Sequence, residues 1–232
     1  MKKLIIILMV FMQHISVVLA QDPQVAGSKK IDQLMKEKIM ILKNGALLVR
    51  LQTKENSINA LREGGNAEQA NQVEARQQAF NKEVVAAFKS EFTFCPVYFF
   101  PSKYSENILS GDVNAVVFVN DSLQPDASIK FSQKDFLTAE FGPIEPDTAS
   151  YYEDTHYDRS GSNLEKDKGY YGGANMGFEA LKIMNKNFIQ LKKPFPYYVR
   201  TYDSLPVERK LSKAVKKMNS ELNDFYLKSK GK

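Results

Sequence analysis

The 232-residue sequence has few of the side chains on which common chemistries depend: one cysteine, two histidines and no tryptophan. A single cysteine excludes a disulfide within the chain and a zinc site built from several thiolates. Catalysis by a Ser–His–Asp or Cys–His group needs a histidine to take the nucleophile's proton. After residue 20 the chain offers only His156. No segment after residue 20 is long and apolar enough to predict a membrane span.

The first twenty residues have the pattern of a secretory signal peptide. Two lysines precede an unbroken apolar run over residues 4–10, and the run continues less regularly to residue 18. The tripeptide VLA at 18–20 places small residues where signal peptidase requires them. We therefore expect cleavage between Ala20 and Gln21 and a periplasmic or secreted protein. The alternative, an uncleaved anchor, is disfavoured because polar residues 13 and 14 interrupt the run.

The charge of the chain does not indicate a nucleic-acid partner. The formal net charge is +5, and removal of the two lysines in 1–20 lowers it to +3. A surplus this small, without a dense basic patch, is not the footprint of a nucleic-acid-binding protein. The glycines near residue 170 match neither a dinucleotide-binding motif nor a P-loop. We expect no cofactor and no resident metal.

The hydrophobic periodicity predicts one α/β domain over residues 21–232. A strand at 46–52, a long amphipathic helix at 66–92 and a nearly continuous apolar strand at 94–100 predict a parallel βαβ unit. In the long helix Gln77 interrupts the apolar stripe, which favours packing on a sheet over a coiled coil. The expected fold is a mixed, mostly buried sheet of about five strands with flanking helices. Further elements are predicted as helices at 28–42, 102–109 and 204–227, strands at 115–120, 135–141 and 197–202, and a hairpin at 178–191.

The segment 142–177 shows no sustained period and is predicted to be a long exposed loop. It is rich in proline, glycine, tyrosine and acidic residues, and a loop of this length in a compact domain is commonly functional or disordered. Tyrosines in such a loop could bind a peptide or a sugar, or could simply pack. The acidic cluster lacks the spacing of an EF-hand. The candidate binding residues are Tyr151, Tyr152, Glu153, Asp154, His156, Tyr157, Asp158, Tyr170 and Tyr171.

Several sequence blocks together resemble an uncharacterised family of secreted proteins from Bacteroidota. The blocks are GALLVRLQT at 45–53, the long helix, FTFCPVYFF at 92–100 and PFPYYVR at 194–200. The resemblance covers most of the mature chain. It implies export and a single domain, and it transfers no activity and no site residues.

The order of elements is also similar to that of thioredoxin-like domains. A long helix and a buried strand precede the segment 101–105 (PSKYS), which opens a helix. In redox members two cysteines occupy the start of that helix, where the helix dipole lowers a thiol pKa. Ser102 and Ser105 stand at the matching places here, so the resemblance implies a fold without dithiol chemistry. Cys95 lies earlier and is the candidate thiol, although a cysteine in so apolar a segment is usually an inert core residue.

These observations favour a non-catalytic, exported binding protein of the cell envelope that uses the segment 142–177. Its partner would be a protein, a peptide or a glycan. The alternatives are a degenerate thioredoxin-like or single-thiol protein that uses Cys95, and a hydrolase whose residues the sequence does not identify.

Overall fold

The computed structural model describes residues 23–144, 151–157, 163–170, 179–204, 207–208 and 210–231. The chain divides between Leu34 and Met35 into two units. Helix α2 (Pro23–Asn44) contributes its first half to the first unit. The remaining elements belong to the second unit. The expected signal peptide and its cleavage point lie outside the described residues.

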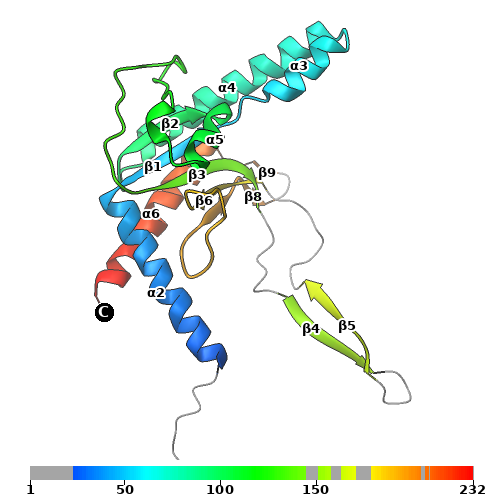
Figure 1. Cartoon of the computed structure of the whole chain (residues 1–232), viewed down its shortest axis with the longest axis vertical. Helices are drawn as coiled ribbons and strands as arrows, with labels where there is room; N and C mark the ends of the chain where they lie inside the picture. Colours follow the sequence, from blue (N-terminus) through cyan, green and yellow to red (C-terminus); the bar gives the residue numbers. More distant parts are fainter. Residues whose placement is uncertain are drawn as a thin grey trace, which may run out of the picture. The chain divides into compact units, whose positions relative to one another are not determined.

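A five-stranded mixed sheet with flanking helices forms the second unit (Figure 1), so the predicted fold class is confirmed. The strand order is β2-β1-β3-β6-β7. Strand β1 pairs in parallel with both β2 and β3, whereas β6 runs antiparallel to β3 and to β7. The bounds of these strands are β1 Ala46–Leu51, β2 Val97–Pro101, β3 Phe136–Pro143, β6 Glu179–Met184 and β7 Tyr198–Arg200.

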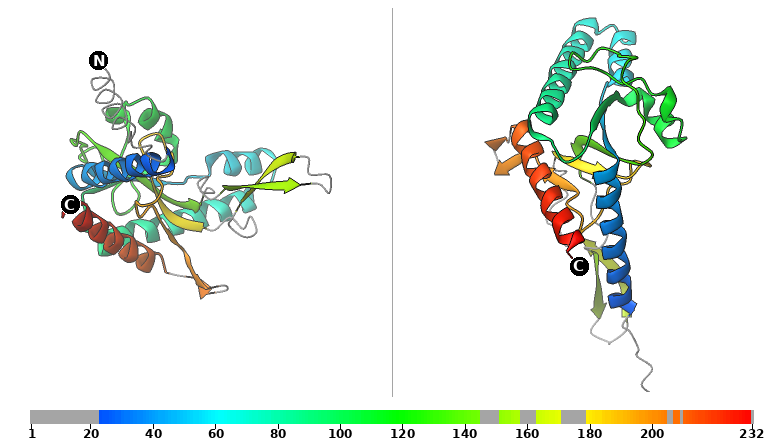
Figure 2. Two further views of the ribbon diagram at one scale, coloured as in Figure 1. Left: turned by 90° about the horizontal axis from the view of Figure 1, so that it is seen from below. Right: turned by 90° about the vertical axis from the view of Figure 1, so that its left-hand side faces the viewer.

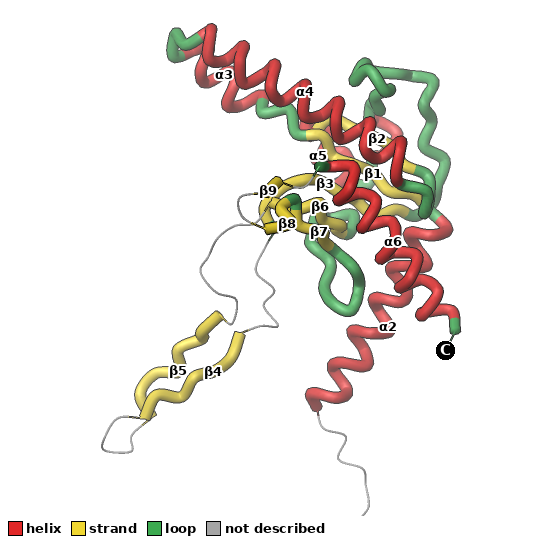
Figure 3. Tube along the Cα trace, turned by 180° about the vertical axis from the view of Figure 1, so that it is seen from behind, coloured by secondary structure: helices red, strands yellow, loops and turns green. Residues whose placement is uncertain are grey.

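Helices α4 (Ala67–Glu91) and α6 (Leu211–Lys230) cover one face of the sheet, as Figure 3 shows from behind. Leu47 and Val49 alternate with Leu48 along β1, which assigns the first two side chains to this face and Leu48 to the other. The large cluster on the helical face buries Phe88 of α4 and Met218 of α6. Helix α3 (Glu55–Glu63) packs beside α4 (Figure 2).

A smaller cluster closes the opposite face of the sheet. Leu48 and Phe100 pack there against Ile108 of the short helix α5 (Ser105–Leu109) and against Phe118. Two 3-10 turns flank this region, η2 (Ser102–Tyr104) and η3 (Val113–Ala115). The helical part of the connection from β2 to β3 therefore lies on the face opposite α4.

Three predicted elements differ from the structure. Residues 115–120 are not a strand of the sheet, because after η3 the chain only touches β2, through the Val119 amide and the Phe99 carbonyl. The last helix begins at Leu211 rather than at residue 204, and 202–204 and 207–208 form the strands β8 and β9 instead. In the hairpin 178–191, β6 turns back at Asn185 but the return forms a single bridge.

The segment predicted as a loop carries regular structure. Strands β4 (Tyr151–Tyr157) and β5 (Asn163–Tyr170) form an antiparallel pair, with Tyr151 opposite Tyr170 in the register. Backbone pairing can form over polar sequences that show no hydrophobic alternation, so the absence of a period did not exclude strands.

In the described part of the chain, no helix combines the length and the apolar character needed to cross a membrane.

Candidate functional site

The carboxyl ends of three parallel strands meet at one edge of the sheet. After β1 the chain crosses to β2 on one side, and after β2 it crosses to β3 on the other side of β1. In open α/β sheets, ligands bind outside the carboxyl ends of the strands, where successive connections leave in opposite directions. The strand order therefore directs attention to the residues that follow β1, β2 and β3.

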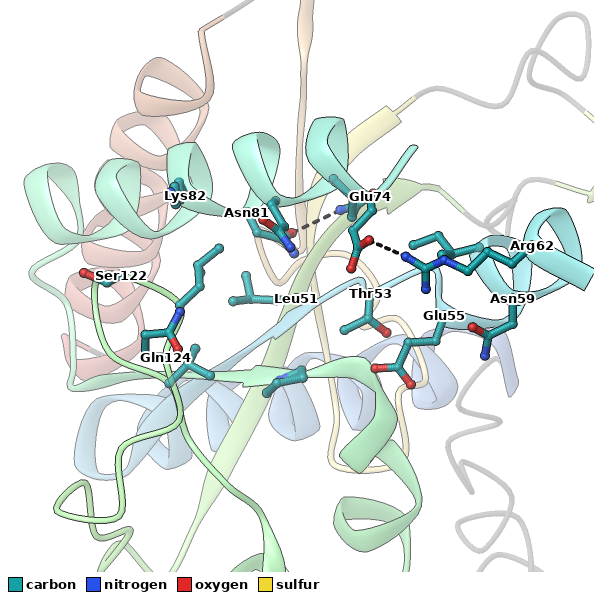
Figure 4. Close-up of a pocket in the computed structure, with 16 residues that line it drawn as sticks. Leu51, Thr53, Glu55, Asn59, Arg62, Glu74, Asn81, Lys82, Ser122 and Gln124 are labelled. Carbon is teal, nitrogen blue, oxygen red and sulfur yellow. Dashed lines mark hydrogen bonds and ion pairs between the residues drawn. The ribbon is translucent and has the colours of Figure 1, made fainter. Parts of the chain in front are cut away.

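Two cavities lie at this edge, and we name them the amide pocket and the crevice pocket. The amide pocket, of about 320 Å³, extends from the ends of β1 and β2 to α3, α4 and the loop 119–124 (Figure 4). The crevice pocket, of about 580 Å³, lies at the ends of β1 and β3. Gln77 of α4 lines both cavities.

The residues after β1 contribute alternately to the two pockets. Leu51, Thr53 and Glu55 line the amide pocket, whereas Gln52 and Lys54 line the crevice pocket. This alternation continues the two-residue period of the strand. Lys54 departs from the extended conformation and has a left-handed backbone, at φ 53°. A non-glycine residue in this region is unfavourable by about 1–2 kcal/mol and is commonly found at binding sites.

Glu140 of β3 is the centre of a buried ionic network. Its Oε2 accepts hydrogen bonds from the Arg50 Nε at 2.7 Å and the Gln52 Nε2 at 3.0 Å. Its Oε1 lies 3.0 Å from the Lys182 Nζ, which also donates to the Pro143 carbonyl. The Glu140 and Lys182 side chains are only 5% and 8% exposed. Because one carboxylate serves two cations from neighbouring strands, the network carries one net positive charge.

A chain of amides connects this network to α4. The Asn81 Nδ2 donates to the backbone carbonyl of Gln52 at 2.9 Å, and the Gln77 Nε2 donates to the Asn81 Oδ1 at 3.1 Å. Gln77 and Asn81 are buried on the face of α4 that otherwise packs on the sheet. An unsatisfied buried amide is unfavourable, so these bonds explain how α4 tolerates polar residues there. The same bonds hold Gln77 in place where the two pockets adjoin.

Other amides of the amide pocket have unused hydrogen-bonding capacity. Asn59, Gln78 and Gln124 are exposed, and no side chain or backbone group in the described ranges bonds to their side-chain amides. The charged residues at the rim balance one another. Arg62 and Glu74 form an ion pair at 2.7 Å, and Glu55 and Lys82 add one charge of each sign.

The loop 119–125 forms the outer wall of the amide pocket and is held by Asn120. The Asn120 Oδ1 accepts from the backbone amides of Ser122 and Gln124, at 2.9 and 3.1 Å. Leu123 then adopts a left-handed backbone, at φ 63°, and lines the pocket. A turn followed by one left-handed residue is a common three-residue hairpin loop, and that residue is usually glycine.

The loop 184–190 repeats this arrangement on the other face of the sheet. Asn185 accepts from the amides of Asn187 and Ile189, and Phe188 is left-handed at φ 57°. The Phe188 ring lies over the Arg50 guanidinium, with 4.5 Å between the guanidinium carbon and the ring centroid. In both loops a bulky apolar residue has the unfavourable left-handed backbone. Leu123 lines the amide pocket, and Phe188 contacts Arg50 of the Glu140 network.

Ser102 and Ser105 do lie at the start of the helical segment after β2, but their hydroxyls serve the fold. The Ser102 Oγ accepts from the Thr53 amide at 3.1 Å, and the Ser105 Oγ donates to the Ser102 carbonyl at 2.6 Å. The Ser102 bond ties the end of β2 to the end of β1, whereas the Ser105 bond is local to the helical segment. A thioredoxin-like fold is not confirmed, since β2, which precedes the two serines, is the edge strand of the sheet.

Cys95 lies in the bend before β2 rather than inside the strand, and its surroundings disfavour a reactive thiol. Burial raises the pKa of the Cys95 thiol to about 12, although the Lys43 ammonium and a hydrogen bond to the backbone of Leu47 act in the opposite direction. A thiol in this state is a weak nucleophile at neutral pH. Cys95 does not line either pocket.

The predicted binding residues of the segment 142–177 are placed only in part. Tyr151 to Tyr157 belong to β4 and Tyr170 to β5, whereas Asp158 and Tyr171 lie outside the described residues. Within the residues whose side chains the structure describes, no group of three His, Cys, Asp or Glu could hold a metal ion. The role predicted for this segment stays a prediction.

Sequence reasoning missed the two pockets. The interruption of the α4 stripe at Gln77 was a usable signal, because a buried amide between apolar turns requires a polar partner. The loop 119–124 reaches the strand ends only through the tertiary structure, which no local sequence pattern predicts.

No family model, no curated protein and no solved structure matches the chain.

The buried and the exposed Arg–Glu pairs give a direct test of the Glu140 network. Glu140→Gln should lower the free energy of unfolding by about 3 kcal/mol, because Arg50 and Lys182 would lose a buried counter-charge. Glu74→Gln, which breaks an exposed pair of equal length, should cost less than about 1 kcal/mol. Urea denaturation of both variants measures the difference. Equal losses would show that Glu140 is not the anchor of this edge.

The Cys95 thiol should be inert in the native protein. With a pKa of about 12, about one thiol in 10⁴ is ionised at pH 8. Dithionitrobenzoate should therefore label one thiol per chain only after unfolding. Above pH 9 the unfolded thiol ionises before the folded one, so Cys95 should make the fold less stable as the pH rises from 9 to 12. Complete labelling of the folded protein within seconds would restore the single-thiol hypothesis.

Proposed function

We propose that this chain is an exported, non-catalytic binding protein that captures a short stretch of peptide backbone in the amide pocket. The observation that carries the proposal is the convergence of neutral amides on a cavity at the carboxyl ends of parallel strands. Its volume lies at the lower end of the range of small-molecule sites. We infer export from the pattern of residues 1–20. A peptide is one of the three classes of partner that the sequence indicated, beside a protein and a glycan.

Amide side chains match the hydrogen-bonding pattern of a peptide backbone. Each amide offers donors and an acceptor, and each peptide unit does the same. Asn59, Gln78 and Gln124 are positioned on three different elements around the cavity. A ligand that met them would satisfy groups that solvent now satisfies, and the balanced rim charges impose no net charge on it.

The apolar part of the pocket favours a peptide over a sugar. Its apolar lining residues are aliphatic or proline, namely Leu51, Ile58, Pro101, Val119 and Leu123. A small aliphatic side chain can pack on such a surface. The described residues that line this pocket include no aromatic ring that could stack on a sugar. The single-thiol alternative draws no support from Cys95, whose thiol is held protonated.

Peptide capture should depend on the free amides. A pool of N-acetylated tetrapeptide amides with uncharged side chains should be retained by the immobilised protein and identified by mass spectrometry. Gln78→Ala combined with Gln124→Ala removes two hydrogen-bonding groups, so retention should fall by on the order of tenfold or more. Gln69→Ala is the matched control, because Gln69 is exposed on the same helix and does not line the pocket.

Two outcomes of that experiment would contradict the proposed function. In one, the double variant retains the peptides as well as the wild type does. In the other, a mixture of oligosaccharides is retained and the peptides are not. Unchanged thermal unfolding of the double variant would show that any loss arises at the pocket rather than from the fold.

Export should remove residues 1–20. When the full-length gene is expressed in a Gram-negative host, N-terminal sequencing of the envelope fraction should give a chain that begins at Gln21. A protein that keeps Met1 and sediments with membranes would contradict export by cleavage. Replacement of Ala20 by a large residue should block processing, which links the result to this cleavage site.

A further inference from the structure

The crevice pocket differs from the amide pocket in its charge. Lys54 and Arg76 line it, both are exposed, and neither side chain forms an ion pair within the described residues. Glu140, one of the two acids that line the crevice, is already occupied by Arg50 and Lys182. Glu179 is the other acid. The Glu179 carboxylate offsets one of the two cations, so Lys54 and Arg76 leave a surplus of one positive charge in the crevice.

The backbone at Lys54 places this cation away from the amide pocket. Thr53 and Glu55 line the amide pocket, and Lys54 between them lines the crevice pocket. Lys54 has the left-handed backbone conformation at this point, with φ 53°. Lys54 therefore stands at the end of β1, beside the point where the connections of β1 and β2 diverge.

The crevice also has an apolar wall. Phe80 of α4 is 39% exposed, and its ring meets Phe141 of β3 edge to face, with 6.1 Å between the centroids. An exposed phenylalanine on a helix face that carries Arg76 and Gln77 is available to a ligand. The crevice thus combines two cations, one carboxylate that is unpaired in the described part of the chain, and one aromatic surface.

The geometry points to the crevice pocket as the subsite for a free C-terminal carboxylate and the last side chain of the bound peptide. This inference rests on the proposed function. Gln77 lines both cavities, so the two pockets adjoin at this residue, and a peptide that occupied both would cross it. Lys54 and Arg76 pair with the carboxylate. Phe80 packs against an apolar last side chain. The ligand is then a C-terminal peptide segment with a free carboxylate and uncharged side chains.

The test compares two pools of N-acetylated tetrapeptides that have the same uncharged sequences and differ only at the C-terminus. One pool ends in a carboxylate and the other in a carboxamide. The full-length gene product should retain the carboxylate pool about fivefold more strongly, as expected for exposed ion pairs. The preference should shrink at 1 M salt. Sequences that end in an apolar residue should be enriched among the retained carboxylates.

Three variants decide the assignment. Arg76→Gln and Lys54→Gln should each lower the preference for the carboxylate and leave retention of the carboxamide pool unchanged. Lys103→Gln makes the same change in net charge at an exposed residue that lines neither pocket, and it should keep the full preference. If Lys103→Gln lowers the preference equally, the effect is one of net charge and the subsite is refuted.

The possible failures are distinguishable. Equal retention of both pools by the wild type would overturn the carboxylate subsite and leave peptide binding in the amide pocket standing. Retention of neither pool would overturn the proposed function and this inference together. A preference that survives in Arg76→Gln and Lys54→Gln would place the carboxylate elsewhere and overturn the assignment.

Discussion

One buried carboxylate joins the strands at the edge of the sheet where the two proposed binding pockets lie. Glu140 stands between Arg50 on β1 and Lys182 on β6, so a single acid joins three adjacent strands. It also fixes the Gln52 side chain, and the Gln52 carbonyl in turn accepts from Asn81 of α4. This series of contacts joins α4 to the end of β1, between the two pockets. Such buried charges commonly specify one arrangement at some cost in stability.

The site also shows where the fold tolerates unfavourable conformations. Leu123 and Phe188 occupy left-handed positions that glycine would fill without strain. Each is held by an asparagine that satisfies two backbone amides of its loop. Leu123 borders the amide pocket and Phe188 covers Arg50. Together with Lys54, the strained residues of the described chain therefore border or support the proposed site, which agrees with the tendency of strain to collect at functional positions.

The sequence predicted the layers of the fold better than it predicted the site. Apolar periodicity identified β1, α4, β2, β3 and α6, because burial on one or both faces of an element leaves a regular pattern. The same rule failed at 115–120, where apolar residues cover one face of the sheet as an irregular segment, and at 151–170, where polar strands pair without a pattern. The sequence indicated Cys95 as a candidate thiol, Ser102 and Ser105 as thioredoxin-like positions and the tyrosine-rich segment as a binding loop. The pockets are built instead from ordinary amides on four separate elements, and their convergence depends on strand order, which local patterns do not contain.

The most direct test is an NMR titration of the uniformly ¹⁵N-labelled protein with the most strongly retained peptide. We predict that the largest backbone shifts occur at Thr53, Gln78 and Gln124, around the amide pocket, with further shifts at Lys54 and Arg76 when the peptide ends in a carboxylate. Shifts confined to residues 151–157 and 163–170 would contradict this prediction, because the peptide would then bind the tyrosine-rich hairpin rather than the carboxyl edge of the sheet.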